Sequence, residues 1–307
     1  MRISTSWAQQ LGVNAMLNQQ ATVTKTQMQL STGLKNLTPA DDPIAAKKIL
    51  DFQERIDKTT QYQENAEVAR ARNGLENSTL INSRESLMRA RDLAVQALNE
   101  GVLIDEDKRA IESEIKQIQA HMLGLANTQD ANGEYIFSGA LSKTSTFALA
   151  PPYAYQGSGT QRELQIGSDR RIVDGDLGFD IYENIPTASA APPATRNIFN
   201  TLEAFSDGLT GAVLPYHDTI NQALADIDAA LEKIGEAEAR TGARLRVLDA
   251  QENQNDSYLL DMKTVLSATK DLDYAEAISR FELESTVLQA SQQAYSKVQN
   301  LSLFKFL

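Results

Sequence analysis

Apolar side chains recur at helical spacing through both halves of the chain. In the first half, steps of seven, four, three, four and three residues separate Ile104, Ile111, Ile115, Ile118, Met122 and Leu125. The second half repeats the pattern in Ile220, Leu224, Ile227, Leu231 and Ile234, and continues it in Leu245, Leu248, Leu259, Met262 and Leu266. Residues three and four apart share one face of a helix. Both regions therefore predict long amphipathic helices.

Proline and glycine positions indicate where these helices begin and stop. Five of the eight prolines lie in 151–193, and none lies in 44–150 or 216–307, so long helices are permitted only in the flanks. A further helix is expected to begin at Asp42-Pro43, because Asp suits the N-cap and Pro suits the first helical position. Gly74 predicts an interruption of this helix and Gly101 predicts a turn.

The centre of the chain has a different pattern. Short β-prone runs occur at 135–137, 163–166, 171–173 and 179–182, and turn-forming residues such as Asn132-Gly133 and Gly157-Ser158-Gly159 separate them. Residues 184–195 read as a linker that returns from this segment.

The predicted fold is therefore mainly α, with long antiparallel helices in a coiled-coil-like bundle and an inserted β-rich domain. We expect a terminal coiled-coil assembly domain from 1–42 and 271–307. A helical bundle domain is expected from 43–139 and 196–270, with a β-rich outer domain at 140–195.

Both termini carry amphipathic heptads with polar residues in the seam. Residues spaced by sevens are Met16, Val23, Leu30 and Leu37 at one end, and Tyr274, Phe281, Leu288 and Tyr295 at the other. Gln20 and Gln27 are expected at the intervening core positions of the first helix, a device that can specify register. The predicted inter-subunit assembly seam consists of Leu11, Met16, Val23, Leu30, Leu37, Ile278, Phe281, Leu288, Tyr295, Val298, Leu301 and Phe304.

Charge is distributed unevenly along the chain. The 307 residues include 41 acidic and 29 basic side chains, a net charge of −12, which disfavours a general nucleic-acid binder. No Asp or Glu occurs in residues 1–40 or after Glu284. Copies of acid-free termini can approach one another without like-charge repulsion, so this pattern favours self-association of the two ends.

Signals for chemistry are weak. The chain has no cysteine, and its two histidines, His121 and His217, stand in unrelated contexts. The Asp130-Ala131-Asn132-Gly133 stretch lacks the flanking acids of a calcium loop and reads as a hairpin turn. Ser267 and Lys270 form an isolated SxxK match. We expect no catalytic residue, no metal site, no cofactor, no cleaved signal peptide and no membrane insertion.

Three stretches carry a resemblance to a known family. The chain contains QLSTGLKNLTPADDPIAAKKI at 29–49, ARNGLENSTLINSRESLMRARDLAVQALNEG at 71–101 and DLDYAEAISRFELESTVLQASQQAYSKVQNLSLFKFL at 271–307. These resemble the N-terminal signature, the following helix and the closing helix of the flagellin-like family. The start MRISTS, the DPIAA at 42–46 and the ending LSLFKFL further resemble the family's branch at the junction of flagellar hook and filament.

The resemblance implies a structural protein of the bacterial flagellum and not an enzyme. Such a chain would leave the cell unfolded through the flagellar type III apparatus, after a dedicated export chaperone binds its C-terminal segment. It would form a closed ring of about eleven copies. Its other partners would be hook-associated protein 1 and flagellin.

Two other functions remain open at this stage. The chain could be flagellin, the filament subunit itself. Alternatively, it could be a type III-exported effector or translocator that inserts into membranes, although Gln-rich seams argue against insertion. An enzyme would need an active site in the β-rich insertion.

The terminal helices contain few apolar side chains. The conformational-entropy cost of ordering them exceeds the free energy gained by burying those side chains, so we predict that residues 1–35 are mobile in the monomer and become ordered on assembly. Hydrogen exchange on dilute monomer should show much faster exchange in 1–35 than in 104–125. Equal protection of the two segments would contradict this.

Overall fold

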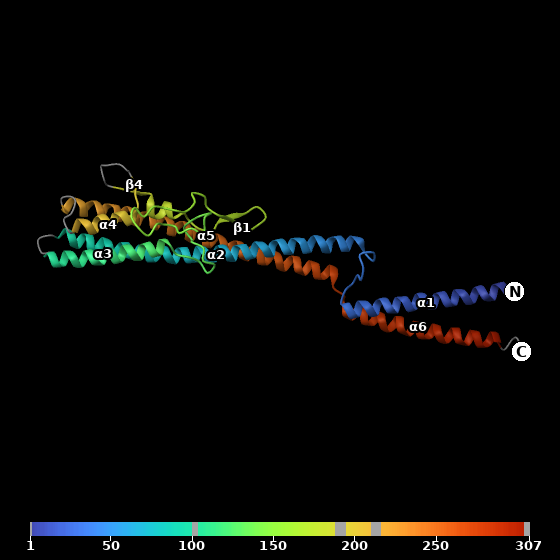
Figure 1. The fold of residues 1–307 in the computed structure, drawn as a ribbon. Helices are drawn as coiled ribbons and strands as arrows, with labels where there is room; N and C mark the ends of the chain where they lie inside the picture. Colours follow the sequence, from blue (N-terminus) through green and yellow to red (C-terminus); the bar gives the residue numbers. More distant parts are fainter. Residues whose placement is uncertain (1, 100–103, 188–194, 210–215, 304–307) are drawn as a thin grey trace. The chain divides into compact units, whose positions relative to one another are not determined.

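The structure is a computed structural model that describes residues 2–99, 104–187, 195–209 and 216–303. This part of the chain is mainly helical (Figure 1). Its α-helices are α1 (Arg2–Thr32), α2 (Pro43–Leu98), α3 (Asp105–Ala126), α4 (Ile198–Leu209), α5 (Tyr216–Lys270) and α6 (Tyr274–Leu303). Between α3 and α4 lie β1 (Glu163–Gln165), β2 (Arg171–Val173), β3 (Ile185–Pro186) and β4 (Thr195–Arg196). The expected mainly α fold is confirmed, and the described part of the insertion contains two small two-stranded sheets.

The chain divides into two compact units. The first contains residues 1–58 and 257–307, and the second contains residues 59–256. Both boundaries fall inside long helices, one within α2 and one within α5. Residues 43–58 and 257–270 group with the termini, and the predicted outer segment 140–195 groups with the helical bundle.

The start of α2 confirms the predicted cap. The Asp42 carboxylate accepts hydrogen bonds from the amides of Ile44 (3.1 Å) and Ala45 (3.0 Å), and Pro43 is the first helical residue. The predicted interruption at Gly74 is wrong, because α2 continues through it. An isolated glycine weakens a helix by only ~1 kcal/mol, which packing of a long helix outweighs. Gly101 lies outside the described residues.

Within the second unit, α2 and α5 run antiparallel and are joined by charged pairs. Arg70 pairs with Asp249, Arg84 with Glu238 (2.8 Å) and Arg91 with Asp228 (2.6 Å). As the residue number rises on α2 it falls on α5, which gives the antiparallel register. Exposed pairs of this kind contribute little stability individually, so the apolar core must supply most of it.

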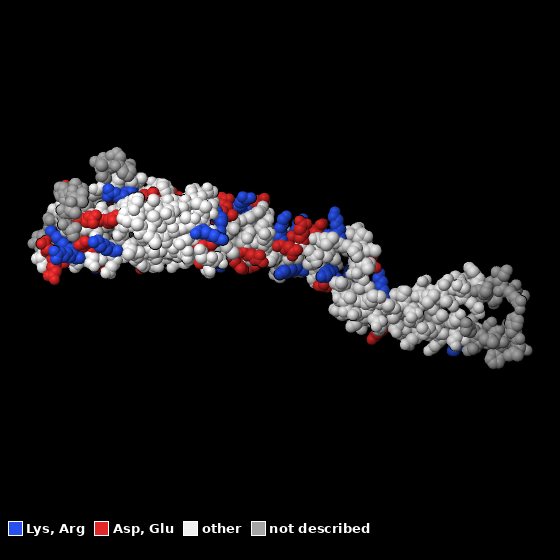
Figure 2. Space-filling model, viewed as in Figure 1, with Lys and Arg blue, Asp and Glu red and all other residues white. Residues whose placement is uncertain are grey.

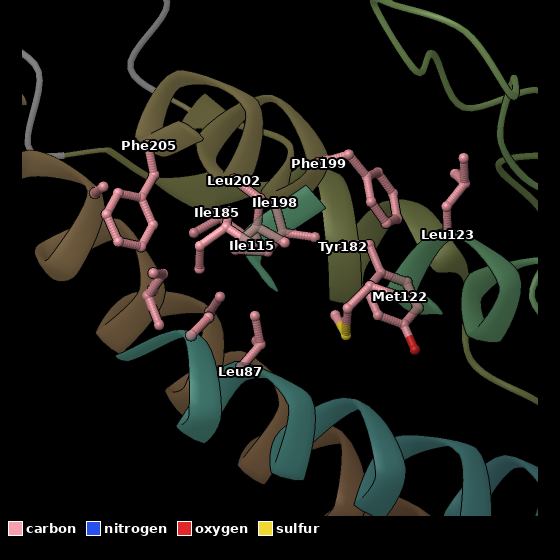
Figure 3. Packing of buried hydrophobic residues seen from close by; sticks show 14 of the residues in the cluster. Leu87, Ile115, Met122, Leu123, Tyr182, Ile185, Ile198, Phe199, Leu202 and Phe205 are labelled. Atoms are coloured by element: carbon pink, nitrogen blue, oxygen red, sulfur yellow. The ribbon is translucent and has the colours of Figure 1, made fainter. Parts of the chain in front are cut away.

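That core joins the helices to the inserted segment (Figure 3). Leu87 of α2, Ile115 and Met122 of α3 and Phe199 of α4 are all fully buried or nearly so. Aromatic rings of the insertion pack edge-on into the same cluster, with Phe147 5.1 Å from Phe199 between ring centroids. The insertion therefore shares its core with the bundle.

The inserted segment contains less strand than the sequence predicts. β1 and β2 form the expected antiparallel hairpin, with Leu164 opposite Ile172. However, 179–182 lies in a π-helical turn, η1 (Phe179–Glu183), and 135–137 supplies only a bridge from Tyr135 to Gln129. Adjacent residues in both runs are buried together, which the alternation of a half-exposed strand does not allow.

Two clusters of charged groups lie where the inserted segment contacts α2. Arg72, 5 % exposed on α2, contacts Asp130 (3.0 Å), Glu134 (3.2 Å) and Asp174 (3.3 Å). The Asp130 carboxylate also accepts the amides of Asn132 and Glu134, which closes the predicted hairpin turn. This arginine therefore holds the turn and the β1–β2 hairpin against α2.

The second cluster surrounds Glu76 of α2, which is 1 % exposed. Its carboxylate accepts hydrogen bonds from the Asp176 amide (3.2 Å) and the Thr241 hydroxyl (3.4 Å), and Arg244 lies 3.5 Å away. Burial, followed by repulsion from the Asp176 carboxylate, raises the pKa of Glu76 to about 7.

Because the pKa of Glu76 is raised on folding, its protonated form stabilises the fold below pH 4.5, and this stabilisation is lost as pH rises through about 7. We expect Glu76→Gln to gain up to ~3 kcal/mol of unfolding free energy relative to the native chain between pH 4.5 and 8. Urea unfolding at several pH values measures this. The control is Glu232→Gln, at an exposed position of α5. Parallel pH curves for Glu76→Gln and the native chain would contradict the prediction.

Candidate assembly surface

The terminal helices α1 and α6 pair with each other in an antiparallel arrangement (Figure 1). A Cβ added at Gly12 would lie 3.5 Å from the Tyr295 ring, and one at Gly33 would lie 2.9 Å from the Tyr274 hydroxyl. Residue numbers thus rise on one helix as they fall on the other. The two contacts, at opposite ends of the pair, fit the same antiparallel alignment.

Six heptad residues of the two helices lie on the face that packs against the other helix, whereas Tyr274, the first residue of α6, is 52 % exposed. Half-buried apolar positions spaced by sevens are Met16, Val23 and Leu30 on α1, and Phe281, Leu288 and Tyr295 on α6. Six of the twelve predicted seam residues therefore pack within one chain. Their burial supports α1–α6 pairing before any second copy is considered.

The polar positions between them differ from the prediction. Gln20 and Gln27 are exposed, whereas Gln19 is half-buried and Thr26 is only 3 % exposed. The next polar residue of the seam is therefore three residues after each apolar one, not four. Both spacings fit a heptad, and only the partner helix decides which face is covered.

A non-helical connection closes the pair at one end. Gly33, at φ +69°, ends α1, and its carbonyl accepts the Leu272 amide, while Lys35 donates to the Lys270 carbonyl (2.9 Å each). Leu37 is half-buried in this connection and does not continue the α1 seam. The Lys25 ammonium and the Thr38 amide and hydroxyl hold the pKa of Asp41 at about 2.

A second set of apolar side chains on the helix pair faces outward. Leu11, Ile278 and Val298 belong to the predicted seam and are 48–60 % exposed. The prediction missed other exposed residues: Trp7, Leu17, Met28, Leu283 and Val287, which are 43–67 % exposed. Exposed apolar side chains that recur along a helix pair indicate an interaction surface, whereas single exposed apolar side chains do not.

Helix α1 carries no acidic side chain, whereas α6 carries Glu276, Glu282 and Glu284. On the face drawn in Figure 2, few coloured side chains lie over the described parts of α1 and α6, whereas many lie over α2, α3 and α5. The last acidic residue of the chain, Glu284, is half-buried in the α1–α6 seam. We call the outward apolar set (Trp7, Leu11, Leu17, Met28, Ile278, Leu283, Val287 and Val298) the outer face. The backbone of Leu301 lies in α6, but its side chain and Phe304 lie outside the described residues.

The described residues offer little for catalysis or metal binding. They contain no group of three or more His, Asp or Glu side chains that could hold a metal ion. His121 and His217 are exposed on α3 and α5. A cleft of about 670 Å³ beside α4 is lined by carboxylates and amides such as Glu203 and Asn200, and its described lining residues include no Ser or His. Within the same residues, no helix is long and apolar enough to cross a membrane.

Comparisons with known proteins match both ends of the chain. Residues 3–142 match the model of the bacterial flagellin N-terminal helical region, and residues 217–307 match that of the bacterial flagellin C-terminal helical region. The flagellar hook-associated protein 3 of Escherichia coli strain K12 is 29% identical, over 99% of this chain and 99% of its own. The flagellin of Bacillus subtilis strain 168 is 23% identical, over 98% of each.

A crystal structure of flagellar hook associated protein-3 from Legionella pneumophila has a similar fold. It superposes with a TM-score of 0.64 at 22% identity, covering 72% of this chain and 98% of that one. At this identity the similarity shows the fold alone.

The two apolar sets of α6 should respond differently to truncation. Leu288→Ala removes a half-buried side chain from the seam and should weaken the free energy of α1–α6 pairing by ~1–2 kcal/mol. Leu283→Ala, at a position 66 % exposed, should change it by less than ~0.5 kcal/mol. Rapid hydrogen exchange of α1 amides reports the difference. Equal effects of the two substitutions would show that the seam is not where we place it.

Proposed function

The chain belongs to the flagellin family, and on that premise we propose that it is a structural adaptor of the bacterial flagellum, located at the junction of hook and filament. The observation that carries this proposal is the similarity to hook-associated protein 3 along nearly the whole of both chains. Flagellin of comparable coverage is less similar. The match includes the terminal helices on which assembly would depend.

Assembly would bury the outer face of the α1–α6 pair. In one copy, side chains such as Trp7, Leu17 and Leu283 are 57–67 % exposed, and each returns ~1–2 kcal/mol when fully covered. Neighbouring copies can supply that cover because α1 has no acid and no acid follows Glu284 on α6. One chain alone buries only the inner seam of the α1–α6 pair. The pair would thus become fully ordered only in the assembly, which couples its folding to polymerisation.

The partners follow from the same proposal. Copies would form a closed ring, for which we expect about eleven copies. Hook-associated protein 1 would contact one side of the ring and flagellin the other. Before export through the flagellar type III apparatus, a chaperone would cover the C-terminal segment, whose exposed apolar residues Leu283, Val287 and Val298 would otherwise associate early.

A filament subunit is the second candidate. The family models and the full-length match to a flagellin favour it, since both proteins share the same terminal helices. The two functions differ in what the cell makes without the chain. Loss of a junction protein leaves hooks and releases flagellin into the medium, whereas loss of flagellin leaves hooks and no flagellin.

We therefore expect a deletion strain to be non-motile, with hooks on the cells and flagellin monomer in the medium. Electron microscopy with antibody against residues 140–195 should label only the hook–filament junction of wild-type cells. Label along the whole filament would contradict a location at the junction and would support the filament-subunit function instead.

Point variants test the outer face in the same strain. Leu283→Asp should be secreted but unassembled, with flagellin leaking into the medium, because burying an unpaired carboxylate costs several kcal/mol. Gln289→Asp adds the same charge at an exposed polar position of α6 and serves as the control. Leu288→Asp should also fail, through loss of α1–α6 pairing. Normal filaments on Leu283→Asp cells would exclude the outer face from assembly.

A further inference from the structure

The inner seam of the α1–α6 pair alternates between apolar and polar or small residues. On α1, Met16, Val23 and Leu30 alternate with Gln19, Thr26 and Gly33. On α6, Phe281, Leu288 and Tyr295 alternate with Ala277, Glu284 and Ser291. From Met16 to Leu30 and from Phe281 to Tyr295, each helix therefore presents one large apolar residue per heptad to its partner.

Such a seam does not define its own register. A shift of seven residues, about 10 Å along a helix, places apolar residues opposite apolar residues again. Only contacts that occur once in the seam can distinguish the native alignment from the shifted one. The apolar layers thus supply attraction without specifying alignment.

One polar layer in the seam is not repeated. The Thr26 hydroxyl donates to the Glu284 carboxylate at 2.7 Å, and the Gln19 side-chain amide donates to the Glu284 backbone carbonyl at 3.2 Å. Thr26 is almost completely buried, so its hydroxyl has little access to water. Glu284 is the only acid among the seam residues named above.

We propose that the Gln19–Thr26–Glu284 layer sets the register of α1 against α6. A shift of seven residues in one direction moves Glu284 away from Thr26 toward Gly12, which has no side chain to donate. A shift in the other direction moves it away from Gln19 toward Gly33. In either case a hydrogen bond is lost, and a carboxylate or a buried hydroxyl is left without its partner.

The register matters for the outer face as well. Leu283 and Val287 flank Glu284 on α6, whereas Leu17 and Met28 lie on α1. A shifted pair would displace the two halves of the outer face by about 10 Å along the pair axis. This proposal concerns one chain and does not depend on the flagellar function.

The connection at the other end of the pair offers a competing explanation. The Gly33–Leu272 and Lys35–Lys270 backbone hydrogen bonds could align the helices without help from Glu284. The two explanations differ in the effect of changing the polar layer alone, because those backbone bonds use none of its side chains.

The chain has no cysteine, so introduced pairs report register without background. Gly12→Cys with Tyr295→Cys reports the native alignment, since these positions are in contact. Gly12→Cys with Leu288→Cys reports a shift of seven residues. A thiol cross-linker with a reach well below 10 Å, applied to dilute full-length monomer, separates the two. Peptide mass mapping identifies the products.

With the polar layer intact, the native pair should cross-link and the shifted pair should not. Thr26→Val combined with Glu284→Leu should raise the ratio of shifted to native product about tenfold, the effect of one hydrogen bond to a carboxylate. Glu284→Gln keeps an acceptor for Thr26 and should restore the native ratio. The control moves the same changes to exposed positions two residues away, Thr24→Val with Glu282→Leu.

An unchanged ratio in the Thr26→Val, Glu284→Leu chain would overturn the proposal and assign register to the Gly33–Leu272 connection. Loss of both products would also overturn it, because the layer would then hold the helices together instead of aligning them. An equal shift in the control would attribute the effect to added apolar surface.

Discussion

The contact between α1 and α6 is the interaction on which the organisation of the terminal unit depends. Each helix presents one apolar residue per heptad to the other, so neither buries enough surface to be stable alone. Pairing within one chain covers Val23, Leu30, Phe281 and Leu288 but leaves the outer face in water. The apolar surface that stays exposed is the one that we propose neighbouring copies cover.

The second unit differs because it buries a large apolar core of its own. Its core joins four helices to the inserted segment through fully buried rings such as Phe147, Phe199 and Tyr182. Arg72 and Arg244 compensate carboxylates that the insertion brings against α2, including Asp174 and Asp176. Buried charges of this kind are destabilising when one partner is removed, and they help explain why the insertion occupies one position on the bundle.

Sequence periodicity predicted the elements that have strong local signals. The Ile111–Leu125 pattern gives α3, Asp42-Pro43 gives the start of α2, and residues 163–165 and 171–173 form the expected hairpin. It placed 196–270 in the helical bundle without distinguishing α4 as a separate helix, although Ile198, Leu202, Phe205 and Leu209 have helical spacing. It also read 179–182 as a strand, because burial of adjacent residues depends on the surrounding core.

The sequence by itself determined that the termini are amphipathic, repeated by sevens and, in residues 1–40 and after Glu284, free of acids, because these are local properties of composition and spacing. It could not determine which face of each heptad is inner. Gln20 and Gln27 fit the pattern as well as Gln19 and Thr26 do, and the same period allows alignments that differ by seven residues. Only the tertiary structure decided both, since burial and the Thr26–Glu284 hydrogen bond exist only when the two ends of the chain meet.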